Sequence, residues 1–154
     1  MFIYIAYKDS PELSSFRRTS TDADLSVEKT LLVNPNCPVR IMLEYIRKKC
    51  KLGIYTNFDL CDESGGLMGL FNLPSYAYAT DQFAHKKTYY VIVIKQENEK
   101  RVSVLPQLNR ENRIYLELKA RVKRFLLTGN VSPQTTSPAK VTPPPPNKVT
   151  GKKK

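Results

Sequence analysis

The sequence predicts an α+β domain in which one amphipathic helix packs against a sheet. Apolar residues recur at helical spacing over residues 39–50, whereas residues 1–7 and 88–95 are rich in the aromatic and β-branched residues that strands favour. With 154 residues, the chain is long enough for one such domain with accessory segments.

The N-terminal part of the chain predicts two strands separated by a long polar segment. Residues 1–7 form the first strand, and residues 28–33 form the second, which ends at an Asn-Pro-Asn sequence. Residues 8–26 are rich in Asp, Ser, Thr and Pro and show no period. We therefore predict a surface loop there, longer than the usual connection between two hairpin strands.

The clearest helix signal begins at Pro38, where a missing N–H does no harm. Five apolar side chains then fall on one helical stripe: Val39, Met42, Leu43, Ile46 and Cys50. The last turns carry cations, which suit the C-terminal end of the helix dipole. Gly53 is the residue expected to end the helix at its C′ position.

Three further strands are predicted, over residues 58–61, 67–71 and 88–95, with a turn at residues 62–66 between the first two. Because residues 88–95 are continuously apolar, we expect a central strand that is buried on both faces. The resulting order is β-β-α-β-β-β. This order is typical of a β-grasp, in which a mixed sheet wraps across one helix.

Positive charge is concentrated in the C-terminal third. The formal net charge is +11, of which residues 1–95 contribute +2, residues 96–127 contribute +4, and residues 128–154 contribute +5. Electrostatic attraction to acidic partners is therefore expected from the segments that follow the predicted core.

A second amphipathic helix is predicted over residues 111–127, capped by Asn109 and ended by Thr128 and Gly129. Its apolar stripe and the arginines around it form a candidate partner-docking surface: Tyr115, Leu118, Val122, Phe125, Leu126, Arg113, Arg121 and Arg124. The pattern alone leaves two possibilities open. The stripe packs on the chain's own sheet, or it docks into the groove of a partner.

These elements divide the chain into three parts. Residues 1–95 form the domain, including the loop at 8–26, and residues 96–128 form a connector and the amphipathic helix. Residues 129–154 contain six prolines and no acidic residue, so we expect a disordered, basic tail. Four consecutive prolines at 143–146 suit either a linker or a polyproline helix.

No catalytic, metal or cofactor site is predicted, and we do not expect an enzyme. The three cysteines match no metal-binding spacing, His85 lacks a nucleophile motif, and the glycines at 65–69 lack the Lys-Ser/Thr of a phosphate-binding loop. No apolar run approaches the roughly 18 residues of a membrane span, so an intracellular, cytoplasmic protein is expected.

Residues 17–20, Arg-Arg-Thr-Ser, resemble a basophilic kinase site. Phosphorylation of Ser20 would place about two negative charges beside two arginines. Such tetrapeptides are common by chance, so Ser20 is a candidate modification site only.

Several segments resemble the ubiquitin-like superfamily: the opening Met-Phe-Ile, the helix end at residues 48–53, and the last strand near residue 90. More narrowly, residues 1–3, 59–65 and 88–91 resemble the chromosome X open reading frame sixty-five proteins. That resemblance implies a ubiquitin-like fold without known catalysis, in a family associated with ciliated cells and sperm.

We therefore expect a non-catalytic adaptor or structural subunit that docks through its sheet face. The resemblance implies a large assembly such as the ciliary or flagellar axoneme, with microtubules or acidic tubulin tails among the partners. The alternative is a basic nucleic-acid-binding protein, which the placement of Tyr89 and Tyr90 in a predicted core strand disfavours. A ubiquitin-pathway enzyme would need a reactive thiol, for which Cys37 at the helix start is the candidate.

Overall fold

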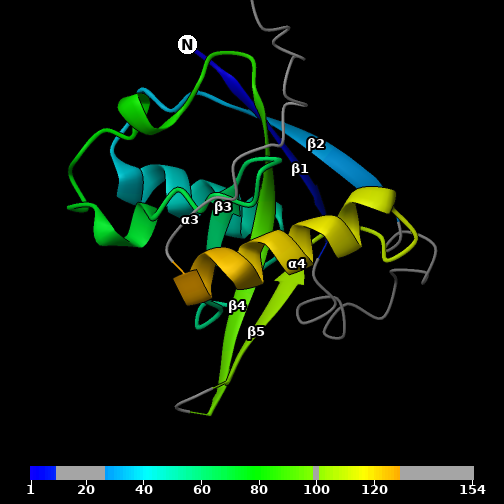
Figure 1. The fold of residues 1–154 in the computed structure, drawn as a ribbon. Helices are drawn as coiled ribbons and strands as arrows, with labels where there is room; N and C mark the ends of the chain where they lie inside the picture. The colour runs from blue at the N-terminus through cyan, green and yellow to red at the C-terminus, as the bar shows by residue number, and fades with distance from the viewer. Residues whose placement is uncertain (10–26, 99–100, 129–154) are drawn as a thin grey trace, which may run out of the picture.

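A computed structural model describes residues 1–9, 27–98 and 101–128 (Figure 1). These residues form five strands, two α-helices and two short 3-10 helices: β1 (Ile3–Lys8), β2 (Glu28–Val33), α3 (Val39–Lys49), β3 (Phe58–Cys61), η1 (Leu70–Asn72), η2 (Thr80–Gln82), β4 (Thr88–Asn98), β5 (Arg101–Pro106) and α4 (Arg113–Thr128). The predicted α+β class is confirmed. Among the described residues, no helix is long and apolar enough to cross a membrane.

The strands form one mixed sheet in the order β2-β1-β4-β3, and β5 also pairs with β4. β1 and β4 run parallel, and the other pairs are antiparallel. β4 is the longest strand, and it pairs with β1 near its start and with β5 over its second half. Gln107, which directly follows β5, bonds to both β4 and β1: its N–H donates to the carbonyl of Val91, and its carbonyl accepts from the N–H of Lys8.

Helix α3 covers one face of this sheet. The predicted stripe is confirmed, since Val39, Met42, Ile46 and Cys50 are buried and Leu43 is partly buried. They pack against alternate residues of the strands, which share one face because side chains in a strand point to opposite sides in turn. Burial of each large side chain contributes about 1.5–3 kcal/mol.

The end of α3 differs from the prediction, because Lys51 and not Gly53 takes the C′ position. Lys51 has a φ of 52°, and the N–H of Leu52 donates to Arg47 in a Schellman arrangement. A left-handed conformation costs a non-glycine residue about 1–2 kcal/mol. Part of that cost is offset because the Lys51 ammonium lies 2.6 Å from the buried carboxylate of Asp9.

Strand β4 is buried on both faces over most of its first half, as predicted. Tyr89, Val91 and Val93 belong to the core under α3, whereas Tyr90 and Ile92 belong to a second core on the opposite face. Helix α4 covers this second core, and Figure 1 shows it crossing β4 and β5. The described residues therefore form three layers, with α3 on one side of the sheet and α4 on the other.

Two strand assignments from the sequence need correction. The strand predicted over residues 67–71 is wrong: Leu67 makes an isolated bridge to Cys61, and a 3-10 helix begins at Leu70. In its place the fifth strand is β5, which lies in the segment that was predicted to be a connector. β4 also continues to Asn98, past the predicted end at residue 95.

The start of α4 also differs from the prediction. The helix begins at Arg113, and Asn112 caps it, since its Oδ1 accepts from the Ile114 N–H at 3.1 Å. The predicted cap, Asn109, instead donates its backbone N–H to Glu28 at 2.9 Å. Glu28 also accepts from the Asn112 side chain, so β2 holds the segment that leads into α4.

Candidate protein-docking groove

The apolar stripe of α4 divides into a buried part and an accessible part. Tyr115, Leu118 and Val122 are buried against the chain's own sheet, so these three cannot dock on a partner as one of the two sequence interpretations proposed. The physical reason is that β4 is apolar on both faces and needs a second cover. The same packing closes the outer face of the sheet over β4, so the expectation that this face itself docks is also corrected there.

Phe125 and Leu126 lie on the C-terminal side of Val122, the last buried residue of α4. Phe125 is half-buried, and Leu126 remains 40 % exposed. Both line a groove of about 650 Å³ between the end of α4 and the segment that follows β3. The other residues that line it are Asn57, Phe58, Asp59, Leu67, Gly69, Phe71, Asn72 and Ile94.

Asp59 holds the wall of the groove that faces α4. Its buried carboxylate accepts the N–H groups of Leu60 at 2.8 Å, Gly69 at 2.7 Å and Leu70 at 3.4 Å. Burial raises the pKa of Asp59, and these three N–H groups oppose that rise by favouring the carboxylate. The carboxylate thereby fixes the path of residues 67–70, which explains why they do not continue as a strand.

Phe71 is the largest accessible apolar side chain of that wall. It is 52 % exposed, and its ring meets Phe58 edge to face, with 5.5 Å between the ring centroids. Edge-to-face pairs of this kind favour a defined ring orientation. An aromatic side chain that is held in place and still half exposed suits the anchoring of a partner's apolar group.

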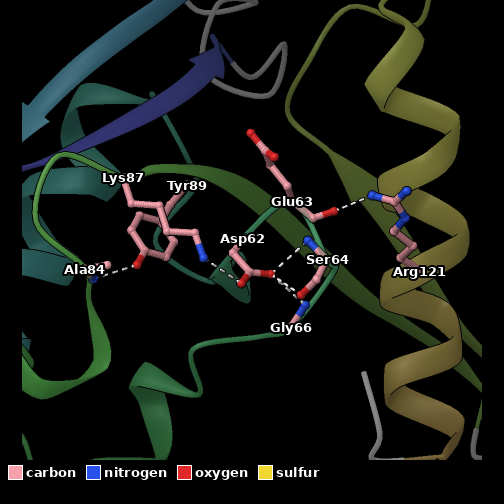
Figure 2. A network of polar contacts seen from close by, with 8 residues as sticks. All are labelled: Asp62, Glu63, Ser64, Gly66, Ala84, Lys87, Tyr89 and Arg121. Atoms are coloured by element: carbon pink, nitrogen blue, oxygen red, sulfur yellow. Dashed lines mark hydrogen bonds and ion pairs between the residues drawn. The ribbon is translucent and has the colours of Figure 1, made fainter. Parts of the chain in front are cut away.

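The turn after β3 fixes the position of α4 (Figure 2). Gly65 has a φ of +84°, and a Cβ built there would lie 2.5 Å from the Cβ of Arg121. Only glycine therefore lets the helix approach this closely. The Arg121 guanidinium donates to the carbonyl of Glu63 and also lies 3.3 Å from Glu117.

Asp62 organises the same turn, as Figure 2 shows. Its Oδ1 accepts from the Ser64 N–H, the Ser64 hydroxyl and the Gly66 N–H, and its Oδ2 lies 3.0 Å from the Lys87 ammonium. Burial alone would raise the pKa of Asp62, but the hydrogen bonds from Ser64 and Lys87 outweigh it and lower that pKa. Asp62 is thus the structural acceptor of the turn that the sequence predicts at residues 62–66.

The predicted arginines of α4 have different roles. Arg121 is engaged in seating the helix, so it is not available to a partner in this arrangement. Arg113 is exposed and lies 4.0 Å from Glu117. Lys123 and Arg124 are exposed in the last turns of α4, which also carry Phe125 and Leu126.

The candidate chemical residues lie elsewhere. Burial raises the pKa of Cys37, raises that of Cys50 to about 12, and also raises that of Cys61. A thiol at Cys37 that is activated by a helix N-terminus is therefore not supported. His85 accepts the Phe2 N–H through Nδ1 at 3.3 Å. The described residues contain no group of three His, Cys, Asp or Glu placed to hold a metal ion.

Residues 26–115 match the family model described as "Putative Interleukin 2 receptor, gamma chain" (Il2rg). The match covers 90 of the 154 residues. The chain belongs to this Il2rg family. No solved structure matches the chain. The Il2rg match includes the wall of the groove from Asn57 to Asn72, whereas Phe125 and Leu126 follow the matched region.

The sequence did not indicate the groove wall. Phe71 and Asn72 fell in or beside a predicted strand, and Ile94 was assigned to the core. One signal was present in Asp59, a charged residue inside a short apolar strand. A carboxylate at such a position requires buried hydrogen-bond donors. Three predicted features lie outside the described residues: the loop from residue 10 to residue 26, Ser20 within it, and the tail at residues 129–154.

Proposed function

We propose that this chain is a non-catalytic protein-interaction module, acting as an adaptor or structural subunit. Its groove receives a partner segment that carries one or two large apolar side chains and acidic residues. The observation that carries this proposal is the placement of Phe71 and Leu126 on the walls of one groove, where both stay accessible. Lys123 and Arg124 supply the charge that complements an acidic segment.

We further propose that the domain is a ubiquitin-like β-grasp. Support comes from the antiparallel β1-β2 hairpin, the helix α3 that follows it, and the later strand β4 that lies parallel to β1 at the centre of the sheet. The sequence resemblance to the ubiquitin-like superfamily, and to the chromosome X open reading frame sixty-five proteins, points the same way. In this proposal α4 is an addition that covers the second face.

The assembly proposed for this module is the ciliary or flagellar axoneme, with a microtubule-associated protein or tubulin as partner. The family resemblance supports this location, and the net charge of +11 suits acidic partners. Nucleic-acid binding is the alternative. It is disfavoured because Tyr89 and Tyr90 are buried in β4 and cannot stack on bases.

The groove is tested by position-specific photo-crosslinking of the full-length protein in ciliated cells. A photoreactive amino acid replaces Leu126 in one variant and Leu116 in the other; Leu116 is an exposed leucine of the same helix that does not line the groove. We expect a partner to be captured at position 126 and not at position 116.

The affinity of the purified partner is then measured for two variants of the chain. Truncation of a hot-spot residue at the centre of an interface costs at least about 2 kcal/mol, or roughly a thirtyfold loss of affinity. We expect Leu126→Asp to weaken binding by this order and Leu116→Asp to leave it nearly unchanged. Equal crosslinking at both positions, or equal affinities of the two variants, would refute the groove as the docking site.

The location is tested separately. The protein should co-purify with axonemes that have been washed with salt, and a purely soluble distribution in ciliated cells would contradict it. Nanomolar RNA binding that persists at physiological salt would favour the nucleic-acid alternative instead.

A further inference from the structure

The turn between α3 and β3 presents two apolar side chains to solvent. The Thr56 N–H donates to the Gly53 carbonyl at 3.0 Å, which places Ile54 and Tyr55 at the two central positions of a β-turn. Ile54 is 75 % exposed and Tyr55 is 92 % exposed, the highest value among the exposed large hydrophobic residues of the described chain. Isolated exposed apolar residues are ordinary, but two adjacent ones at the apex of a turn are not explained by the fold.

This turn is held in place by a buried part of the domain. The Arg47 guanidinium donates to the carbonyls of Gly53 and Thr56, and it lies over the ring of Phe58 at 5.1 Å from the centroid. On the other side of the turn, the Asn57 carbonyl accepts from the Ile94 N–H at 2.9 Å. The two apolar side chains are therefore presented on a supported turn and need little further ordering on binding.

The surroundings of the turn are positively charged. Residues 45–58 contain Arg47, Lys48, Lys49 and Lys51 and no acidic residue. Lys48 and Lys49 are exposed in the last turn of α3, and Arg47 of that same helical turn is bonded to the apical turn. Lys51 is instead paired with Asp9. The apex is thus apolar, and Lys48 and Lys49 belong to the helical turn that Arg47 bonds to it.

We propose that this turn is an interfacial anchor for an anionic phospholipid surface. Ile54 and Tyr55 enter the boundary between headgroups and acyl chains, while Lys48 and Lys49 contact the phosphates and carboxylates of the headgroups. The combination of exposed apolar side chains with exposed cations carries the assignment, because an anionic bilayer binds cations at its headgroups and apolar side chains beneath them. A nucleic acid binds through cations, polar groups and stacking aromatic rings, and Ile54 offers nothing to a base or a phosphate. None of these four anchor residues lines the groove at the end of α4.

The chain contains no tryptophan, which permits a direct test. Tyr55→Trp introduces a single tryptophan at the apex of the turn, and Tyr76→Trp introduces one at a similarly exposed tyrosine, 78 % exposed, as the matched control. Each full-length variant is titrated with phosphatidylserine-rich vesicles that carry a bromine-labelled acyl chain. We expect a blue shift and quenching for Tyr55→Trp and neither for Tyr76→Trp.

Vesicle co-sedimentation measures the contribution of each group. The double change Ile54→Ser and Tyr55→Ser should lower vesicle partitioning at least tenfold, and Lys48→Gln or Lys49→Gln should each lower it about fivefold, as expected for one cation near an anionic surface. Tyr76→Ser should change partitioning by less than about twofold, since its side chain lies outside the proposed anchor. Circular dichroism verifies that each variant is folded.

Two results would overturn the proposal. One is vesicle binding without a spectral change in Tyr55→Trp, which would assign binding to other cations of the chain. The other is the absence of binding to phosphatidylserine-rich vesicles. This result would refute the anchor even if the turn were found to bind a protein.

Discussion

Replacement of Gly65 by alanine is expected to unseat helix α4 while leaving the core under α3 intact. The added Cβ would lie 2.5 Å from the Cβ of Arg121, 2.9 Å from its carbonyl carbon and 3.1 Å from the nitrogen of Val122. Two of these three atoms belong to the helix backbone, so a side-chain rotation cannot relieve the clash. Either the turn or the helix must move.

The magnitude follows from two separate costs. A non-glycine residue at a φ of +84° costs about 1–2 kcal/mol. Overpacking against atoms that cannot move aside costs typically a further 1–3 kcal/mol. The free energy of unfolding should therefore fall by about 2–5 kcal/mol, which is a large part of the stability of a small domain.

Gly69 supplies the matched control. It has a φ of +63°, but the nearest atom to an added Cβ is the side-chain nitrogen of Asn72 at 3.4 Å. Gly69→Ala should therefore show the conformational cost alone, about 1–2 kcal/mol. Urea denaturation of the full-length variants measures both losses, and their difference isolates the contact between the turn and α4.

Thiol labelling shows where the change occurs. Cys61 is buried in the core under α4, whereas Cys50 is buried in the core under α3. If the helix is displaced, Cys61 should react faster with a thiol reagent in Gly65→Ala, and Cys50 should stay protected. The reasoning is refuted if Gly65→Ala is no less stable than Gly69→Ala and Cys61 remains unreactive.

Two further predictions concern the ion pairs. The pKa of Asp62 is lowered in the folded state, so its ion pair with Lys87 stabilises the fold above the unfolded pKa and is lost as pH falls through the folded value. In urea titrations between about pH 5 and pH 2, stability should fall less steeply in Asp62→Asn than in wild type; parallel curves would contradict this. At the end of α3, both Lys51→Ala and Lys51→Gly lose the ion pair with Asp9. The alanine variant keeps the strain of the left-handed backbone, whereas the glycine variant relieves it. Lys51→Gly should therefore be the more stable of the two by about 1 kcal/mol, and equal urea midpoints would show that the strain is negligible.

The elements that the sequence predicted correctly are those whose signal lies within one continuous segment of the chain. The stripe of α3 repeats at helical spacing, and the first half of β4 is apolar at successive positions, so both signals are local. β5 was missed because only two of its six residues are buried and it ends in a proline, so its local strand signal is weak. Its pairing with β4 is the tertiary contact that makes it a strand.

The groove could not be predicted, because its wall depends on hydrogen bonds between distant groups. Asp59 selects the path of residues 67–70, and no local preference of those residues indicates it. The seat of α4, by contrast, could have been inferred. A strand that is apolar on both faces needs a cover on each side, α3 supplies one, and the helix at residues 111–127 was the only other amphipathic helix predicted.

The two roles assigned to α4 are separable along its length. Tyr115, Leu118 and Val122 complete the second core, and a helix that served only to cover the sheet could end soon after Val122. The helix instead continues to Thr128, which adds more than one further turn at about 3.6 residues per turn and leaves Leu126 and Leu127 exposed. Leu127, at 86 % exposed, adds little to the stability of the isolated chain, and Leu126 adds less than a buried leucine would. Substitutions up to Val122 should therefore change stability and binding together, whereas substitutions at Leu126 should change binding far more than stability.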